Sequence, residues 1–131
     1  MVGVAPGFDP AIVSFAQEQG LPMVPGIATA SELSQALTAG LSLVKFFPAE
    51  AAGGVKMIKN LLGAFRFTGV KFMPTGGIKP ANLAEYLAVP EIVACGGTWL
   101  APKEAVANGD WAAIEALAAE ASAMVRAARA G

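Results

Sequence analysis

Short apolar runs alternate with longer amphipathic runs along the 131 residues of the chain. The short runs predict β-strands and the longer ones predict helices, and their spacing of roughly 20 to 25 residues is typical of βαβ units around a parallel sheet. The strands are apolar on both faces, as expected when helices cover both sides of a sheet or when one face fills a barrel. We predict strands over residues 2–5, 22–24, 43–47, 70–73 and 92–95.

Capping signals mark the helices between these strands. Asp9 followed by Pro10 predicts one helix start, and Thr29 with Glu32 three residues later forms a capping box for the next. We see no linker and no low-complexity tract, so one domain over residues 1–131 is expected. Further helices are predicted over residues 55–62, 80–87 and 102–108, and from residue 110 onward.

Composition narrows the classes of function. Hydrophobic residues make up 55% of the chain and charged residues 15%, which is typical of a folded domain. Nine basic and ten acidic residues leave a formal charge of −1, so nucleic acid is not an expected partner. No apolar run approaches the roughly 20 residues that cross a bilayer, and no secretory leader is visible. We therefore expect a cytoplasmic protein without membrane contact.

Histidine is absent from the chain, and Cys95 is its single cysteine. An internal disulfide, a histidine-based metal site and a Ser-His-Asp triad are therefore excluded, and no metal site is predicted. Any chemistry must rest on lysine, carboxylates, hydroxyls and backbone amides. Cys95 itself is expected to be a small buried residue rather than a reactive thiol, and Trp99 and Trp111 are expected to be packing residues.

Lys45 is the polar residue of the third predicted strand. Alternation places it on one face with Leu41, Leu43 and Phe47. Apolar neighbours penalise the charged form of a lysine, so its pKa should fall and a nucleophilic amine becomes available for a Schiff base. The spacing alone favours a lysine that extends to water, or one that protects a sheet edge.

Two loops that follow consecutive strands each contain a Gly-Gly pair and a threonine. Such loops allow backbone amides to approach an anion, and phosphate is the natural candidate. The alternative is that each Gly-Gly pair only ends its strand tightly. The candidate binding residues are Thr75, Gly76, Gly77, Gly96, Gly97 and Thr98.

The segment Lys-Phe-Phe-Pro-Ala-Glu at residues 45–50 resembles the imine-forming signature of the 2-keto-3-deoxy-6-phosphogluconate (KDPG/KHG) aldolase family. Residues 74–78 and 96–99 resemble that family's phosphate-binding segments, with Thr98 where relatives usually have serine. The resemblance implies a (βα)₈ (TIM) barrel lyase, with Lys45 as nucleophile and no cofactor. Glu50 is within reach of Lys45 along the chain as a proton relay, although a solvated carboxylate fits equally well.

The five predicted units correspond to the family's last five, so the resemblance implies a truncated, partial barrel. The first three strands, which in the family carry a general acid/base glutamate and a carboxylate-binding arginine, fall outside this pattern. Exposed apolar surface would then favour a homo-oligomer. The alternative is a rearranged open sheet of flavodoxin-like order 2-1-3-4-5.

Three functions follow from these expectations. The first is a Schiff-base lyase acting on a 2-keto acid such as pyruvate and a phosphorylated aldehyde, with activity weakened or diverted by the missing strands. The second is a module that binds a phosphorylated sugar acid without turnover. The third is a self-associating fragment without catalysis.

Overall fold

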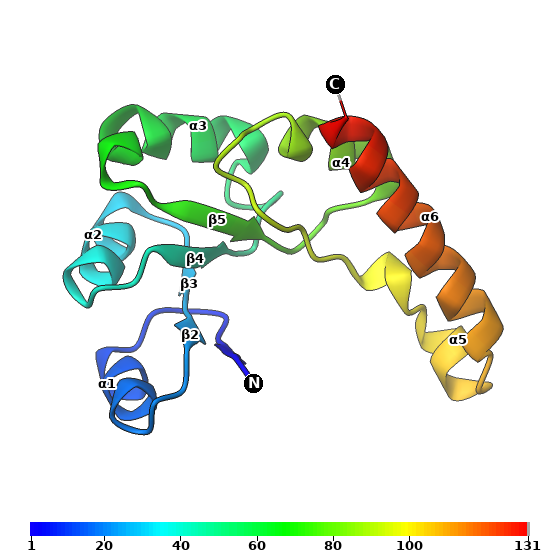
Figure 1. The fold of residues 1–131 in the computed structure, drawn as a ribbon, viewed down its shortest axis with the longest axis horizontal. Coiled ribbons are helices and arrows are strands. Elements are labelled where there is room, and N and C mark those ends of the chain that lie inside the picture. Colours follow the sequence, from blue (N-terminus) through cyan, green and yellow to red (C-terminus); the bar gives the residue numbers. More distant parts are fainter. Residues whose placement is uncertain (131) are drawn as a thin grey trace.

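The computed structural model describes residues 1–130 and has the alternating order that the sequence predicts (Figure 1). The capping signals are confirmed: the Asp9 side chain accepts from the amide of Ala11, and Thr29 and Glu32 form the capping box. The strands are β1 (Gly3–Val4), β2 (Met23–Val24), β3 (Gly26–Ile27), β4 (Leu43–Phe46) and β5 (Lys71–Pro74). The helices are α1 (Pro10–Glu18), α2 (Ala30–Thr38), α3 (Gly54–Phe65), α4 (Pro80–Leu87), α5 (Lys103–Ala107) and α6 (Trp111–Arg129), with 3₁₀ turns at Arg66–Thr68 and Thr98–Leu100.

Every strand pair is parallel, and the pairing follows the order of the chain. β1 pairs with β2, and β3, β4 and β5 pair in that order, with Gly26 opposite Lys45 and Lys45 opposite Met73. Only Pro25 separates β2 from β3, so a single extended segment offers one edge to β1 and the other to β4.

This pairing contradicts the rearranged 2-1-3-4-5 sheet. In that order the first strand would lie between the second and third, whereas β3 pairs directly with β4. The extended segment around Pro25 pairs with β1 through β2 and with β4 through β3, so it lies between these two strands. The rearranged order, in which the first helix crosses to the opposite face of the sheet, is therefore not formed. The result is an α/β fold whose strands neighbour one another in chain order.

Helices α2, α3 and α4 pack against one face of the sheet. On β4, Val44 and Phe46 are fully buried, whereas Leu43 and Lys45 on the alternate face are half-buried. Figure 1 shows α1, α2 and α3 following one another along the outer side of the strands. The buried cluster joins the outer strand face to helices α2, α3 and α4 through Leu33, Ala36, Val44, Phe46, Ile58, Leu61, Leu62, Phe72, Leu83, Tyr86 and Leu87.

The fifth predicted strand, over residues 92–95, forms only isolated bridges. Ile92 is paired with Phe72, and Gly96 with Thr75, both in parallel register. On the other side the Arg129 guanidinium of α6 donates to the carbonyl oxygens of Ile92 and Val93, at 3.1 and 3.0 Å. A regular strand was thus the wrong expectation: the segment follows β5 but contacts a helix end, not a strand, at its outer edge.

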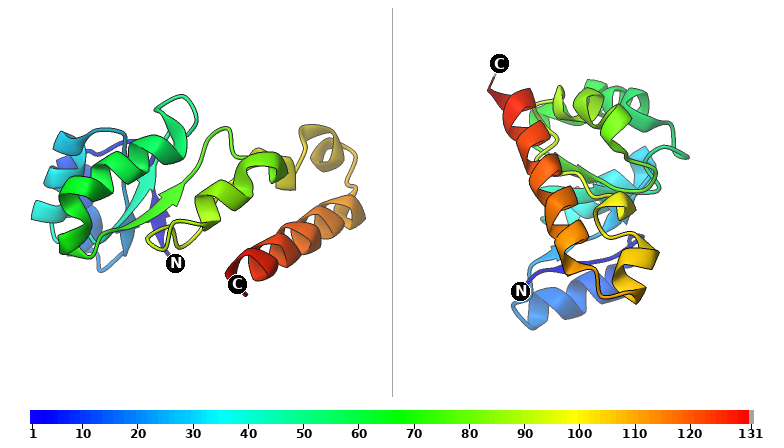
Figure 2. Two further views of the ribbon diagram at one scale, coloured as in Figure 1. Left: turned by 90° about the horizontal axis from the view of Figure 1, so that it is seen from above. Right: turned by 90° about the vertical axis from the view of Figure 1, so that its right-hand side faces the viewer.

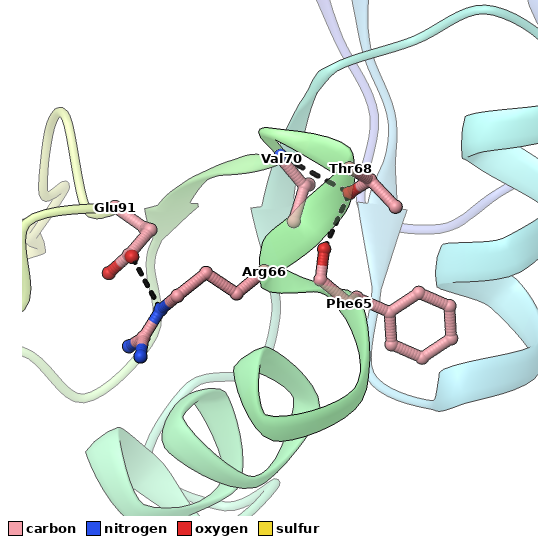
Figure 3. Close-up of polar contacts among 5 residues, drawn as sticks. All are labelled: Phe65, Arg66, Thr68, Val70 and Glu91. Atoms are coloured by element: carbon pink, nitrogen blue, oxygen red, sulfur yellow. Dashed lines mark hydrogen bonds and ion pairs between the residues drawn. The ribbon is translucent and has the colours of Figure 1, made fainter.

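Polar contacts hold the residues that precede β5, at the opposite end of the strand from the glycine loop that follows it (Figure 3). Arg66 Nε lies 2.8 Å from Glu91 Oε1, which ties the 3₁₀ turn to the segment beside β5. The Thr68 hydroxyl donates to the Phe65 carbonyl at 2.6 Å. Because Arg66 is 64% exposed, this ion pair contributes at most a modest stabilisation.

The terminal helix α6 lies on the opposite side of the molecule from α1 and α2 (Figure 2). It contacts α4 and the 3₁₀ turn at Thr98–Leu100, and Met124 and Val125 pack partly against the core. Trp111 at its start is 66% exposed, so the expectation that Trp111 packs is wrong. Within residues 1–130, none of the helices combines the length and apolar character needed to span a bilayer.

Candidate functional site

Lys45 occupies the third position of β4, and the strand register determines where its side chain lies. Its amide donates to the Pro25 carbonyl at 2.9 Å, and the neighbouring strands place Gly26 and Met73 on either side. The side chain is half-buried, on the face that alternation predicts. Its Nζ lies 4.6 Å from the centroid of the Phe47 ring, two residues further along that face.

The loop after β5 requires glycine at two successive positions. Gly76 and Gly77 have φ values of +97° and +81°, a left-handed conformation that side chains disfavour. The second loop approaches this one closely: a Cβ at Gly96 would lie 2.8 Å from the Thr75 side chain. Glycine therefore allows the loop after β5 and the loop after residues 92–95 to come together.

A pocket of about 320 Å³ brings the two loops and the lysine together. Phe47 was not predicted as a site residue, although strand alternation already placed it on the face of Lys45. Glu50, by contrast, does not line this pocket. The lining consists of Lys45, Phe47, Thr75, Gly76, Gly77, Gly96, Gly97 and Thr98.

Thr75 has an unpaired hydroxyl at this pocket. In the part of the chain that the structure describes, Thr75 Oγ1 is buried and has no hydrogen-bond partner. Leaving a buried polar atom unpaired costs about 1–3 kcal/mol, so such atoms are rare and call for an explanation. A bound polar ligand would supply the missing partner.

Trp99 covers the second glycine loop. A Cβ at Gly97 would lie 1.5 Å from a carbon of the Trp99 ring, so the ring rests directly on the backbone. The ring also packs against the buried core, which confirms the packing role predicted for this tryptophan. Gly97 is therefore required by contact with Trp99 and not by a left-handed φ.

Glu50 has a partner other than Lys45. Its carboxylate accepts a hydrogen bond from the hydroxyl of Tyr86, a residue of α4 that is 1% exposed. Burial, the hydrogen bond to Glu50 and the negative charge of that carboxylate all raise the pKa of the Tyr86 phenol well above its ordinary value. The proton-relay role of Glu50 stays a prediction, and the structure links this carboxylate to the core instead.

Cys95 is half-buried and packs against the core. Burial raises the pKa of its thiol to about 11, and the nearby Arg129 cation opposes this only in part. The thiol is therefore protonated near pH 7, which supports the expectation of a packing residue. Among residues 1–130, no three His, Cys, Asp or Glu side chains gather in a group that could hold a metal ion.

The family model for KDPG and KHG aldolase matches residues 2–117. The chain belongs to the KDPG and KHG aldolase family. A 2-dehydro-3-deoxy-phosphogluconate aldolase of Treponema pallidum is 49% identical over 114 residues, which cover 87% of this chain and 53% of that relative. The chain thus spans about half the length of the family members it matches.

Solved structures of the family show the same fold. A KDPG aldolase of Legionella pneumophila superposes with a TM-score of 0.82 at 42% identity, covering 87% of this chain and 54% of that one; its structure captures pyruvate as a covalent carbinolamine. A second, from Zymomonas mobilis with 3-phosphoglycerate, superposes with a TM-score of 0.74 at 38% identity, covering 78% of this chain and 48% of that one.

Proposed function

We propose that this chain carries the imine-forming and phosphate-binding part of a KDPG/KHG aldolase site, with Lys45 as the nucleophile. The observation that carries the proposal is the pocket in which the Lys45 face of β4 meets the two glycine loops. The Lys45 amine, the left-handed backbone at Gly76 and Gly77 and the unpaired Thr75 hydroxyl lie around one cavity of a size that admits a small metabolite.

The chemistry follows from the amine. The neutral Lys45 nitrogen adds to the carbonyl carbon of a 2-keto acid, and the carbinolamine takes up a proton from solvent and loses water to form an iminium ion. In the cleavage direction, the bond between C3 and C4 breaks, its electron pair moves into the iminium to form an enamine, and the C4 hydroxyl gives up its proton to a base. The carbinolamine captured in the Legionella relative corresponds to the first step of this sequence.

The two loops would bind the phosphorylated end of the substrate. In the first loop, the left-handed Gly76 and Gly77 allow backbone amides to form a concave anion site. The second loop adds Thr98 to the same lining, in which Thr75 also lies. The Zymomonas relative was solved with 3-phosphoglycerate, which is a phosphorylated three-carbon acid. We therefore expect a 2-keto acid at Lys45 and a phosphate at residues 75–77 and 96–98.

Turnover requires a base, and the lining of this pocket in the described chain contains no carboxylate. In the family resemblance, the acid/base glutamate and the arginine belong to strands that precede those matched here. Chain-order pairing of β1 to β5 fits a partial (βα)₈ barrel, and such a partial barrel would form the imine faster than it completes aldol cleavage.

A second candidate is binding without turnover, which the lack of a carboxylate in the lining favours.

Self-association is compatible with both candidates. The half-buried Lys45 face and exposed apolar residues such as Val4, Phe15 and Phe67 offer surface that a second copy could cover. Sedimentation of the purified chain would detect such a homo-oligomer, and a monomer at all concentrations would contradict it.

Pyruvate with borohydride tests the proposal directly, because reduction makes an imine permanent. We expect an adduct on the peptide that contains Lys45, read by mass spectrometry. The adduct should disappear in Lys45→Ala and persist in Lys71→Ala, since Lys71 is an exposed lysine of the neighbouring strand. An adduct that survives Lys45→Ala, or the absence of any adduct, would contradict the Schiff-base proposal.

A further inference from the structure

The hydroxyl of Tyr86 is a polar group within an otherwise apolar core. Tyr86 is 1% exposed, and its hydroxyl donates to the Glu50 carboxylate, which belongs to the turn that follows β4. Glu50 is itself exposed to solvent on its other sides. The Tyr86 phenol therefore connects helix α4 to the turn that follows β4, the strand that contains Lys45.

The same turn is attached to the loop after β5. The amides of Ala49 and Glu50 donate to the carbonyl oxygens of Thr75 and Gly76, at 2.8 and 3.1 Å. A Cβ at Gly77 would lie 2.7 Å from the Cβ and Cγ of Glu50, so the Glu50 side chain packs directly against this glycine. Glu50 thus contacts the loop through both its backbone and its side chain.

A second residue of α4 holds the loop directly. The Asn82 side chain donates to the Gly77 carbonyl at 3.2 Å and accepts from the Lys79 amide at 2.7 Å. Asn82 and Tyr86 are four residues apart, so they lie on the same side of α4. One helix face therefore holds the loop by two routes, one of which passes through Glu50.

We propose that Tyr86 is a positioning residue which, through Glu50, holds the Gly76–Gly77 loop at its distance from the strand of Lys45. Two successive glycines have more conformational freedom than any other pair, so their bound shape must be held from outside. A loop that Tyr86 and Glu50 have already ordered loses less conformational entropy when it binds an anion. The consequence for phosphate rests on the function proposed above, whereas the consequence for loop order does not.

Tyr86→Phe removes the hydroxyl and keeps the buried ring. The Ala49 and Glu50 amides report the attachment of the loop, because both donate to its carbonyl oxygens. We expect these two amides to exchange roughly tenfold faster in Tyr86→Phe, by NMR-detected hydrogen exchange. Solvent around Glu50 weakens its hydrogen bond, which is why we expect about tenfold and not about a hundredfold.

Ligand measurements separate positioning from general stability. Affinity for inorganic phosphate should fall roughly tenfold in Tyr86→Phe, while pyruvate trapping at Lys45 should stay within about twofold of the unaltered chain. The single variant Glu50→Gln keeps an acceptor for the Tyr86 hydroxyl, so it should retain most of the phosphate affinity of the unaltered chain. Thr68→Val is the matched control, because it removes a hydroxyl hydrogen bond at the opposite end of β5.

Three results would overturn the proposal: unchanged exchange of Ala49 and Glu50 in Tyr86→Phe, equal losses of phosphate affinity in Tyr86→Phe and Thr68→Val, or equal losses of phosphate affinity and pyruvate trapping. A chain that binds no phosphate before any substitution contradicts the proposed function instead. In that case the exchange of Ala49 and Glu50 alone decides the positioning role, faster exchange in Tyr86→Phe supporting it and unchanged exchange overturning it.

Discussion

The two faces of β4 differ in what they contact and therefore in what they contribute. Val44 and Phe46 are 0% exposed and pack against the helices, whereas Leu43 and Lys45, on the alternate face, are half-buried, and Lys45 lines the pocket. Side chains of a strand alternate between faces, so residues one position apart can serve stability and chemistry separately. A short strand thus supports the core and presents the candidate nucleophile at once.

Adjacent phenylalanines give the largest expected difference. Phe46→Ala should lower the free energy of unfolding by about 3–5 kcal/mol, because it leaves a cavity in the fully buried face. Phe47→Ala, on the half-buried pocket face, should cost roughly half of that or less. Urea unfolding followed by circular dichroism measures both, and equal costs would show that the two faces do not differ in packing.

The loop after β5 extends the comparison beyond the strand. Gly77→Ala should cost about 1–3 kcal/mol, since alanine is strained at a φ of +81° and its Cβ would meet Glu50. Gly63→Ala is the control: it lies in α3 with no atom within 4 Å of the new Cβ, and it should stabilise the chain by about 0.5–1 kcal/mol. Urea unfolding would refute the strain if both substitutions stabilise the chain.

Lys45 tests the chemical face. Lys45→Met keeps an unbranched apolar stem and should change the free energy of unfolding by about 1 kcal/mol or less, because the side chain is half-buried. The same substitution should abolish pyruvate trapping completely. Thermal unfolding and borohydride trapping on one preparation make the comparison, and a large loss of stability would mean that Lys45 is a core residue.

Cys95 gives the smallest expected effect on stability. Because burial raises its pKa from 9.0 to about 11, iodoacetamide should modify the folded chain about a hundredfold more slowly at pH 8 than the urea-unfolded chain, the two-unit difference being a factor of about 100 in thiolate. The folded state holds the thiol proton of Cys95 more tightly than the unfolded state does. The stabilisation of the folded state by this protonated thiol is therefore complete below pH 9 and is lost as the pH rises through about 11. Equal rates of modification would contradict the burial of the thiol.

Several features could be predicted because they are local. Capping at Asp9 and Thr29 depends on residues within one helical turn, and the face of Lys45 depends only on strand alternation. The family resemblance implied that Lys45 and the two glycine loops belong to one site, and the structure brings these residues to one pocket.

Other features depend on contacts between distant residues. Glu50 was expected beside Lys45, five residues away, but its carboxylate binds Tyr86, 36 residues further along the chain. Residues 92–95 have the composition of a strand, yet a continuous ladder did not form where Arg129 contacts the outer edge. Neither the contact of Tyr86 with Glu50 nor that of Arg129 with residues 92–93 produces a periodic pattern in the sequence.

The sequence alone determined the alternation of strands and helices, the side of β4 on which Lys45 lies, and the glycine loops, because each depends on residues that are neighbours along the chain. Only the tertiary structure decided the strand order, the partner of Glu50 and the irregular edge at residues 92–96. These depend on which surfaces meet after folding, and many different surfaces satisfy the same local pattern of apolar and polar residues.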